Sequence, residues 1–382
     1  MHESICLLTE SVSTTTPGKQ IKAIIHAIRV MSNPTHSMEL PRMILIGEGV
    51  ISQLGSFLIN LNKNVKSVSI ISGNIVRARA GTLCNKILNE FSIATYWHTA
   101  PAATIDAVTS LQQFISTDSP DFLIGLGGGR SVDIAKMISF GLQVPFVSVP
   151  TSASHDGISS PFVSIRGHDK PYSLKAHAPI GVLADTELIS KAPDRLNASG
   201  CGDLIGKLTA VKDWELANKE NNEYFGSYAA NLAHLSSRII TDMYKDPSRN
   251  EKDVRTLVEA LISAGVASCI AGSSRPCSGS EHLFSHALEY VSQYDCGLHG
   301  ERVGLGTIMM SKLHCLETES VIKALKNASA PTTAKEIGIS EKDIVRALVM
   351  AQSLRPDRYT ILSKMKLDAD SARRLAKSVN VI

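Results

Sequence analysis

Short apolar segments alternate with amphipathic stretches between residues 42 and 149, and this alternation constrains the fold more than any other feature of the chain. Apolar segments a few residues long, bounded by turn-forming residues, indicate buried strands, whereas longer periodic stretches indicate helices. Strands that alternate with helices form βαβ units and a mostly parallel sheet. The predicted strands are 42–46, 67–71, 93–97, 121–125 and 145–149, and the predicted helices between them are 50–61, 75–91 and 105–116.

The second half of the chain has a different pattern. Beyond about Pro193 the short strands disappear, and helical periodicity predominates. We therefore predict an α/β, Rossmann-like domain over 38–190 and an all-helical domain over 191–382, with the boundary between Asp185 and Arg195. The predicted helices of the second half are 196–217, 225–244, 254–270, 281–293 and 303–316.

Residues 1–37 differ from the rest of the chain because they are rich in Ser and Thr and lack a regular pattern. We expect either a disordered extension or an upstream start codon read in place of Met31 or Met38. A short amphipathic helix over 21–29 leaves open a targeting or membrane-surface arm, although the apolar core and cleavage pattern of a signal peptide are missing.

Composition limits the class of protein. The chain has 382 residues, 43% of them hydrophobic and 20% charged, which is enough to bury a large core. A net charge of +3 without a dense Lys/Arg run gives no sign of a nucleic-acid partner. The 7 cysteines form no CxxC pair, so we expect reduced thiols and a cytoplasmic location. No uninterrupted apolar run reaches the length of a membrane span, so we predict no transmembrane segment.

The strand at 121–125 continues directly into a glycine-rich turn, Gly127-Gly128-Gly129-Arg130-Ser131. Glycines between a strand and a helix let backbone N–H groups approach a pyrophosphate at the helix N-terminus. We therefore predict a dinucleotide site here, with the helix beginning at about Ser131 as its N-cap. The alternative is a tight turn without a ligand, because the sequence is not the GxGxxG fingerprint.

The end of the second predicted strand bears on cofactor choice. A carboxylate at this place would hold a ribose 2′-hydroxyl and repel a 2′-phosphate. Ser72-Gly73-Asn74 offers no acid, so we expect NADP to be accepted. Arg77 and Arg79 follow within the next turn and are candidates to pair with a 2′-phosphate, although exposed helical arginines are usually only solvated.

A histidine pair marks the second half. His282 and His286 are four residues apart, so they share one face of a helix, and His299 follows in a glycine-flanked turn. Ser278 and Glu281 have the spacing of a capping box, which would start this helix. Several imidazoles near one point, with a carboxylate from elsewhere, would make a catalytic metal site. The alternative is an ordinary surface or core pair.

Several motifs occur together in a fixed order. They are Gly127–Asp133 (GGGRSVD), Val149–Gly157 (VPTSASHDG), Gly200–Asp203 (GCGD), Ser273–His282 (SSRPCSGSEH) and Leu298–Glu301 (LHGE). Together they closely resemble sn-glycerol-1-phosphate dehydrogenases of archaea, within the iron-dependent alcohol dehydrogenase and dehydroquinate synthase superfamily. The resemblance extends from Met38 to the tail segment 355–362, and residues 1–37 lie outside it. It implies a dehydroquinate-synthase-like fold.

The resemblance also implies roles for individual residues. Asp203, His282 and His299 match metal ligands, and His286 matches a substrate contact rather than a ligand. Asp156 matches a substrate residue, and Asp203 is expected to touch substrate as well as metal. The implied catalytic residues are therefore Asp203, His286 and Asp156. The implied cofactor contacts are Gly127, Gly128, Gly129, Arg130, Ser131, Thr151, Ser152, Ala153, Ser154 and Ser160.

The implied activity is zinc-dependent reduction of dihydroxyacetone phosphate by NADPH or NADH to sn-glycerol-1-phosphate, a precursor of archaeal ether lipids, by a homo-oligomer. The ligands of the substrate phosphate stay open among Arg275, Ser278, Ser280 and Lys207, and Arg275 is equally suited to hold its loop by an ion pair. Alternatives are glycerol dehydrogenase, another polyol dehydrogenase, dehydroquinate synthase, or a nucleotide-binding scaffold without activity.

Overall fold

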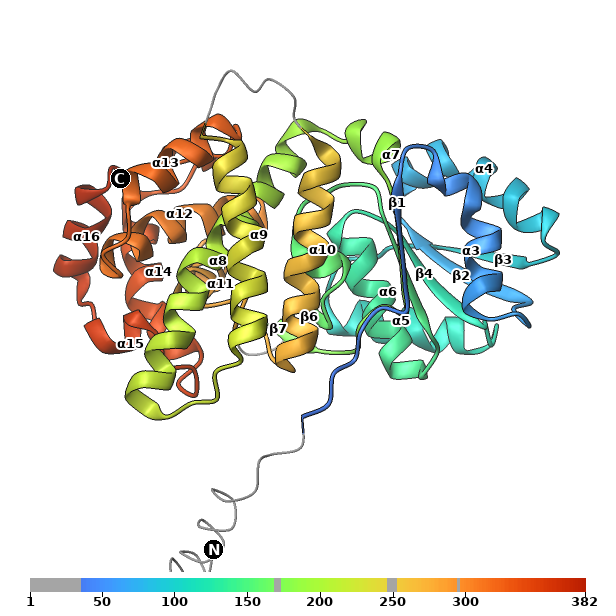
Figure 1. Cartoon of the computed structure of the whole chain (residues 1–382), viewed down its shortest axis with the longest axis horizontal. Helices are drawn as coiled ribbons and strands as arrows, with labels where there is room; N and C mark the ends of the chain where they lie inside the picture. Colours follow the sequence, from blue (N-terminus) through green and yellow to red (C-terminus); the bar gives the residue numbers. More distant parts are fainter. Residues whose placement is uncertain (1–35, 168–172, 246–252, 294–295) are drawn as a thin grey trace, which may run out of the picture. The chain divides into compact units, whose positions relative to one another are not determined.

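A six-stranded parallel sheet forms the N-terminal half in a computed structural model that describes residues 36–167, 173–245, 253–293 and 296–382. The strand order is β1-β8-β5-β4-β2-β3, and the sheet lies on the right in Figure 1. The predicted strands are all present, whereas β8, which lies between β1 and β5 in the sheet, was not predicted. The strands are β1 Met43–Gly47, β2 Ser67–Ser72, β3 Ala94–Thr99, β4 Phe122–Gly127, β5 Phe146–Pro150 and β8 Gly181–Asp185.

Helices cover both faces of this sheet because its strands are apolar on both sides. Val68 and Ile70 of β2 pack with α3 and α4 on one face, whereas Ile71 packs with α5 and α6 on the other. From β2 the chain continues to β3 on one side, whereas from β4 it continues to β5 on the other, so the direction of the connections reverses between β2 and β4. Ligands of such sheets bind at this point, outside the carboxyl ends of the strands. The covering helices are α3 Leu54–Leu61, α4 Asn74–Glu90, α5 Ile105–Ser116 and α6 Gly129–Leu142.

Several short elements were not predicted. Residues 50–61 form a 3-10 turn followed by a helix rather than one continuous helix. A small antiparallel hairpin lies between β5 and β8, and its strands are too short to show an alternating pattern. The short elements are η1 Val50–Gln53, η2 Asp156–Ile158, β6 Phe162–Ser164, β7 Ser173–Lys175 and α7 Thr186–Ser190.

All strands of the described residues precede α8, and the chain beyond it is helical, on the left in Figure 1. Helix α8 packs against α9 and α12, and α11 packs against α12 and α14. The division into domains 38–190 and 191–382 stays a prediction, and residues 38–382 form one compact unit. The helices are α8 Asp194–Asn221, α9 Ser227–Met243, α10 Val254–Ala271, α11 Ser280–Val291, α12 His299–Leu313, α13 Thr318–Asn327, η3 Lys335–Ile337, α14 Glu341–Leu354, α15 Ile361–Met365 and α16 Ala369–Ser378.

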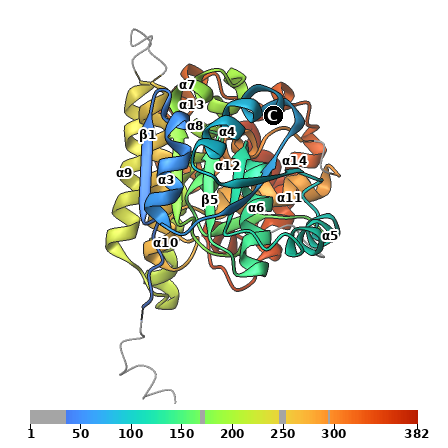
Figure 2. The ribbon, with the colours of Figure 1, turned by 90° about the vertical axis from the view of Figure 1, so that its right-hand side faces the viewer.

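Helix α10 is apolar enough over 18 residues to cross a membrane by length and composition alone. It is the one such helix in the described part of the chain. However, 61% of the helix is buried within the fold, and it contacts β1 and η2, as the rotated view in Figure 2 shows for β1. This burial is typical of a core helix. The predicted extension over 1–37, including the helix at 21–29, lies outside the described residues except for His36 and Ser37.

Candidate active site

Three predicted metal ligands converge from three different helices. Asp203 lies on α8, His282 in the first turn of α11, and His299 at the start of α12. One ligand atom from each lies within 4.8 Å of the others. Asp203 Oδ1 is 3.3 Å from His282 Nε2 and 3.6 Å from His299 Nε2. Two imidazole nitrogens and one carboxylate oxygen around one point fit a divalent metal with open coordination positions, as a catalytic site requires.

Close packing of the backbone makes this convergence possible. A Cβ atom on Gly202 would lie 2.3 Å from the carbonyl oxygen of Gly300, and one on Gly300 would lie 1.7 Å from that of Ser199. Only glycine fits at both positions, so α8 and the first turn of α12 approach until their backbones touch. Gly202 directly precedes Asp203 in the sequence, and Gly300 directly follows His299. The motifs GCGD and LHGE therefore have a packing role as well as ligand positions.

Glu281 sets the orientation of His282. Its Oε1 atom lies 2.8 Å from His282 Nδ1, and the same oxygen accepts a hydrogen bond from the backbone N–H of Gly279. A proton on Nδ1 would leave the lone pair of Nε2 available to a metal ion, as a metal-binding imidazole needs. The predicted capping box with Ser278 is wrong, because α11 begins at Ser280 without a side-chain cap and Glu281 bonds to Gly279 instead.

His286 stands apart from the three converging residues. It lies one turn further along α11 and is buried, with its ring centroid 6.3 Å from that of His299. Its Nδ1 atom is buried and has no hydrogen-bond partner among the described residues. Burial, together with the charges of His299 and His282, holds the pKa of His286 well below its usual value. A neutral ring with an unbonded nitrogen suits a substrate contact, the role that the resemblance implied.

Lys207 connects two carboxylates of the site. The side chain is fully buried, and Nζ lies 2.8 Å from Asp203 Oδ1 and 2.7 Å from Asp156 Oδ2. Burial opposes the charge of Lys207, but Asp156 and Asp203 outweigh it and raise the pKa of this amine. In turn, Lys207 and the two imidazoles hold the pKa of Asp203 well below its usual range in spite of burial. Lys207 is therefore held in ion pairs, which leaves it poorly placed for the substrate phosphate.

The electrostatics of the two metal-facing imidazoles differ. Burial lowers the pKa of His299 to about 4, and its interactions with Asp203 offset this only in part. Burial also disfavours the charge of His282, but hydrogen bonds to Asp203 and Glu281 outweigh it and raise the pKa. The pKa values of the two imidazoles therefore shift in opposite directions.

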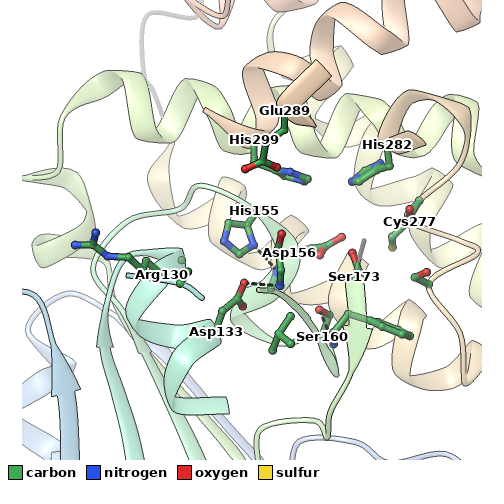
Figure 3. Close-up of a pocket in the computed structure, with 18 of the residues that line it drawn as sticks. Arg130, Asp133, His155, Asp156, Ser160, Ser173, Cys277, His282, Glu289 and His299 are labelled. Atoms are coloured by element: carbon green, nitrogen blue, oxygen red, sulfur yellow. Dashed lines mark hydrogen bonds between the residues drawn. The ribbon is translucent and has the colours of Figure 1, made fainter. Parts of the chain in front are cut away.

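The predicted cofactor loop links β4 to α6. Gly127 has φ of 154°, and a Cβ atom there would lie 2.7 Å from the Ser131 hydroxyl. The helix begins at Gly129 with Gly128 as its N-cap, so the predicted start at Ser131 is wrong by two residues. Because the N-cap residue is a glycine, no capping side chain bonds to the first N–H groups of α6. Such N–H groups at a helix N-terminus can bind a phosphate. Arg130 is exposed, and Figure 3 shows it pointing away from the histidines.

The second predicted cofactor stretch lies beside the first. Residues 151–154 follow β5, which pairs with β4, and the Thr151 N–H donates to the carbonyl of Gly127. Ser152 and Ala153 are buried, and the Ser152 hydroxyl has no partner among the described residues. Ser160 is buried beyond η2 and lines the same cavity as Gly129.

A cavity of about 410 Å³ joins the two halves of the site. Figure 3 shows His282 and His299 on one side, with Asp133 and Ser160 opposite and His155 and Asp156 between them. This volume is in the range of small-molecule sites. The residues that line it include Gly129, Arg130, Asp156, Ser160, Arg166, Ser278, His282, Glu289, His299 and Arg302.

Sequence reasoning missed several residues of this cavity. The ring of His155 packs over Gly129, and its centroid lies 6.0 Å from that of His299. Glu289 of α11 binds Arg302 at 3.2 Å and Arg166 at 2.9 Å, which connects α11 and α12 to the segment after β6. Nothing in the local sequence marks these contacts, because the partners are far apart in the chain.

The adenosine end of the predicted site lies at the ends of β2 and β3. Asn74 begins α4, and its Oδ1 accepts a hydrogen bond of 3.2 Å from the Thr99 hydroxyl. Arg77 lies over the indole of Trp97, 5.3 Å from the ring centroid, and Arg79 is exposed. No acid stands at 72–74, as the sequence already shows.

Comparisons with known proteins agree with this fold. Residues 45–193 match the family model described as iron-containing alcohol dehydrogenase. Solved structures with the same fold include glycerol dehydrogenase from Schizosaccharomyces pombe (TM-score 0.74, 18% identity, 91% of this chain and 90% of that one). Another is sulfoacetaldehyde reductase from Bifidobacterium kashiwanohense in complex with NAD+ (TM-score 0.71, 13% identity, 91% and 99%). The fold places the chain in the dehydroquinate-synthase-like class that includes the iron-containing alcohol dehydrogenases.

Relatives with higher sequence identity define the family more specifically. Glycerol-1-phosphate dehydrogenase [NAD(P)+] of Nitrosopumilus maritimus is 51% identical over 348 residues, which cover 91% of this chain and 98% of the relative. The protein of the same name from Methanosarcina acetivorans is 44% identical over 93% of this chain and 99% of its own length. The chain belongs to the glycerol-1-phosphate dehydrogenase family.

Proposed function

We propose that this protein reduces dihydroxyacetone phosphate to sn-glycerol-1-phosphate with NADPH or NADH. The observation that carries the proposal is the convergence of Asp203 with His282 and His299, two histidines that line a cavity reaching Gly129 of α6. Such a cavity would hold a substrate close to both a metal at these three residues and a dinucleotide at the glycine loop. The proposal agrees with the name of the relatives that match nearly the whole chain.

The proposed metal is zinc, held by Asp203, His282 and His299. A bound zinc ion would supply Lewis acidity toward the substrate carbonyl, and a bound nicotinamide would supply the hydride. Glu281 fixes the tautomer of His282, and Lys207 compensates the charge of Asp203. These two residues prepare the ligand set without contacting the substrate.

His286 and Asp156 are the proposed substrate contacts. As the ketone becomes an alcohol, its oxygen must gain a proton, and His286 can relay one because Nδ1 is unbonded. Asp156 lines the cavity. Its carboxylate is paired with Lys207, and its backbone N–H donates a hydrogen bond of 2.9 Å to Asp203 Oδ2. Its carboxylate is suited to accept a hydrogen bond from a substrate hydroxyl.

The dinucleotide is proposed to lie across the carboxyl ends of β4 and β5. Gly127, Gly128, Gly129, Arg130 and Ser131 would surround the pyrophosphate, with the positive N-terminus of α6 favouring its charge. Thr151, Ser152, Ala153, Ser154 and Ser160 would continue the contact toward the nicotinamide. Because no acid stands at 72–74, we propose that NADPH is accepted as well as NADH.

The cellular role follows from the product. A glycerol phosphate of this handedness would supply the backbone of archaeal ether lipids. We propose a cytoplasmic homo-oligomer with reduced thiols. The reduced thiols are supported by the described cysteines, none of which forms a disulfide. Nucleic acid and membrane are not proposed as partners.

A substrate panel tests the proposal against its alternatives. Zinc-loaded protein should oxidise NADPH or NADH with dihydroxyacetone phosphate and should act far more slowly on dihydroxyacetone or glycerol. Preference for free glycerol would favour a glycerol dehydrogenase instead. If the zinc-loaded protein turned over none of these compounds, a nucleotide-binding scaffold would be favoured.

A further inference from the structure

Arg358 is a buried guanidinium at the edge of the site. It lies between α14 and α15 with 6% of its surface exposed. Its Nη2 atom donates to the Ser274 hydroxyl at 2.8 Å, and Nη1 donates to the carbonyl of Ser278. Both serines belong to the loop that leads into α11 and therefore to His282. A guanidinium has more N–H donors than these two bonds use.

Among the described residues, the charge of Arg358 has no direct partner. No carboxylate among the described residues lies within the 4.0 Å that defines an ion pair with Arg358, whereas neighbouring Arg275 is paired with Glu223 and Arg355 with Asp357. Burial, together with the charges of Arg275 and Arg355, lowers the pKa of Arg358 to about 9. A buried cation without a counter-charge is costly, so this position favours an anion.

Cavities connect this cation to the metal ligands. Arg358 lines a small cavity together with His286, Ser274 and Ser278. The two serines also line the main cavity, which contains His282 and His299. The charge of Arg358 also contributes to lowering the pKa of His286. An anion beside Arg358 would therefore lie next to the proposed substrate contact.

Other cations near the cavity are less suited to bind the substrate phosphate. Lys207 is held between Asp156 and Asp203. Arg302 and Arg166 share the carboxylate of Glu289. Arg275, a candidate from the sequence, forms its ion pair with Glu223 and also bonds the Tyr359 carbonyl, which favours the reading in which it holds the loop. Arg130 is exposed and belongs to the predicted cofactor loop.

We propose that Arg358, with the hydroxyls of Ser274 and Ser278, forms the subsite for the phosphate of the substrate. This inference rests on the proposed function, because it assumes a phosphorylated three-carbon substrate whose carbonyl lies at the metal. In such a molecule the phosphate is separated from the reacting carbon by one carbon and one oxygen. Arg358 then selects the phosphorylated triose over the free one and orients it toward His286.

The test compares a phosphorylated with an unphosphorylated substrate. In Arg358→Ala, kcat/KM for dihydroxyacetone phosphate should fall roughly 10- to 100-fold, as expected for the loss of a charged hydrogen bond. The kcat/KM for dihydroxyacetone should change by less than about threefold. Added guanidinium chloride should restore part of the activity toward the phosphorylated substrate alone. Arg358→Lys, which keeps the charge, should fall between the wild type and Arg358→Ala.

Binding supplies an independent readout. Inorganic phosphate should bind the wild-type protein in calorimetric titrations and inhibit its turnover of dihydroxyacetone, and both effects should be lost in Arg358→Ala. The matched control replaces the neighbouring ion pair as Arg275→Gln with Glu223→Gln, which disturbs the same loop without changing its net charge. This control should keep phosphate binding and the preference for the phosphorylated substrate.

Different outcomes would contradict the proposed function and the proposed phosphate subsite. If wild-type protein did not reduce dihydroxyacetone phosphate, the proposed function would fail. If wild-type protein reduced it and Arg358→Ala retained both the substrate preference and phosphate binding, the subsite would fail while the function stood. An equal loss of activity on both substrates in Arg358→Ala and Arg358→Lys, without rescue by guanidinium, would show a structural role and would also overturn the subsite.

Discussion

The Nδ1 atom of His282 lies 2.8 Å from the carboxylate of Glu281, the residue that precedes it on α11. Neighbouring residues on a helix point in different directions, so this contact requires the Glu281 side chain to bend back over the helix N-terminus, where it also accepts the Gly279 N–H. Thr209 of α8 donates to the other carboxylate oxygen. The orientation of one proposed metal ligand is thus fixed jointly by α8 and α11.

Glu281→Gln should weaken metal binding without removing a ligand. The amide keeps an oxygen for its neighbours but loses the charge that stabilises the Nδ1 proton of His282. We expect zinc affinity to fall about 10- to 100-fold. Competition with a chromophoric chelator measures it, and Glu289→Gln on the same helix is the control, because Glu289 pairs with arginines rather than with the metal-facing histidines. Equal affinities in Glu281→Gln and wild type would contradict this role.

His282→Ala and His286→Ala should have different consequences. His282→Ala removes one of three ligands, so the purified protein should lose both bound metal and turnover. His286→Ala should retain the metal and lower kcat/KM by about 100-fold or more through the loss of proton transfer. Metal analysis by mass spectrometry together with steady-state kinetics checks both variants. Loss of the metal in His286→Ala would show that the two histidines do not have the assigned roles.

Asn74→Asp should change cofactor choice. The side chain keeps its shape and its hydrogen bond from Thr99, but it places a carboxylate at the end of β2. That charge repels a 2′-phosphate and can hold a 2′-hydroxyl. The KM for NADPH should therefore rise about tenfold or more while that for NADH stays near the wild-type value. Asn64→Asp in the turn before β2 serves as a control for added negative charge, and unchanged NADPH kinetics in Asn74→Asp would place the ribose elsewhere.

His98 lies on β3, outside the candidate metal site, and makes the stability of the fold depend on pH in the acidic range. It is buried in β3, and burial, aided by Arg77 and opposed by Asp118, lowers its pKa below 6.5. The folded state therefore binds fewer protons here than the unfolded state. The contribution of neutral His98 to the free energy of unfolding is therefore complete above pH 6.5. It is lost as the pH falls through the lower pKa that His98 has in the folded state.

Urea unfolding at a series of pH values tests this point. His98→Gln should show a shallower fall in the free energy of unfolding below pH 6.5 than the wild type. The exposed His36 provides the control, and His36→Gln should follow the wild-type curve. Parallel curves for wild type and His98→Gln would mean that other groups cause the acid sensitivity.

Much of the fold could be predicted because its signals are local. The strands β2 and β4 are short apolar runs bounded by turn residues, and all predicted strands are present. Helix α6 begins at Gly129 rather than at the predicted Ser131, since glycine caps the helix without leaving a side-chain signal. The short strands β6 and β7 were missed because three residues cannot establish a period.

The site could be predicted only in part. The spacing of His282 and His286 drew attention to α11, but it did not show which of them faces Asp203 on α8, and that division came from the resemblance. Arg358 carried no signal in the sequence, because the lack of a carboxylate beside it depends on how Arg275 and Arg355 are paired. Contacts between distant segments decide such features.

The handedness of the product tests the central claim most directly. Zinc-loaded protein is incubated with dihydroxyacetone phosphate and NADPH until the cofactor is oxidised, and the product is then offered to sn-glycerol-3-phosphate dehydrogenase with NAD+. We predict a glycerol phosphate that this second enzyme does not oxidise, as expected of sn-glycerol-1-phosphate. Complete oxidation by the second enzyme, or no glycerol phosphate at all, would contradict the account.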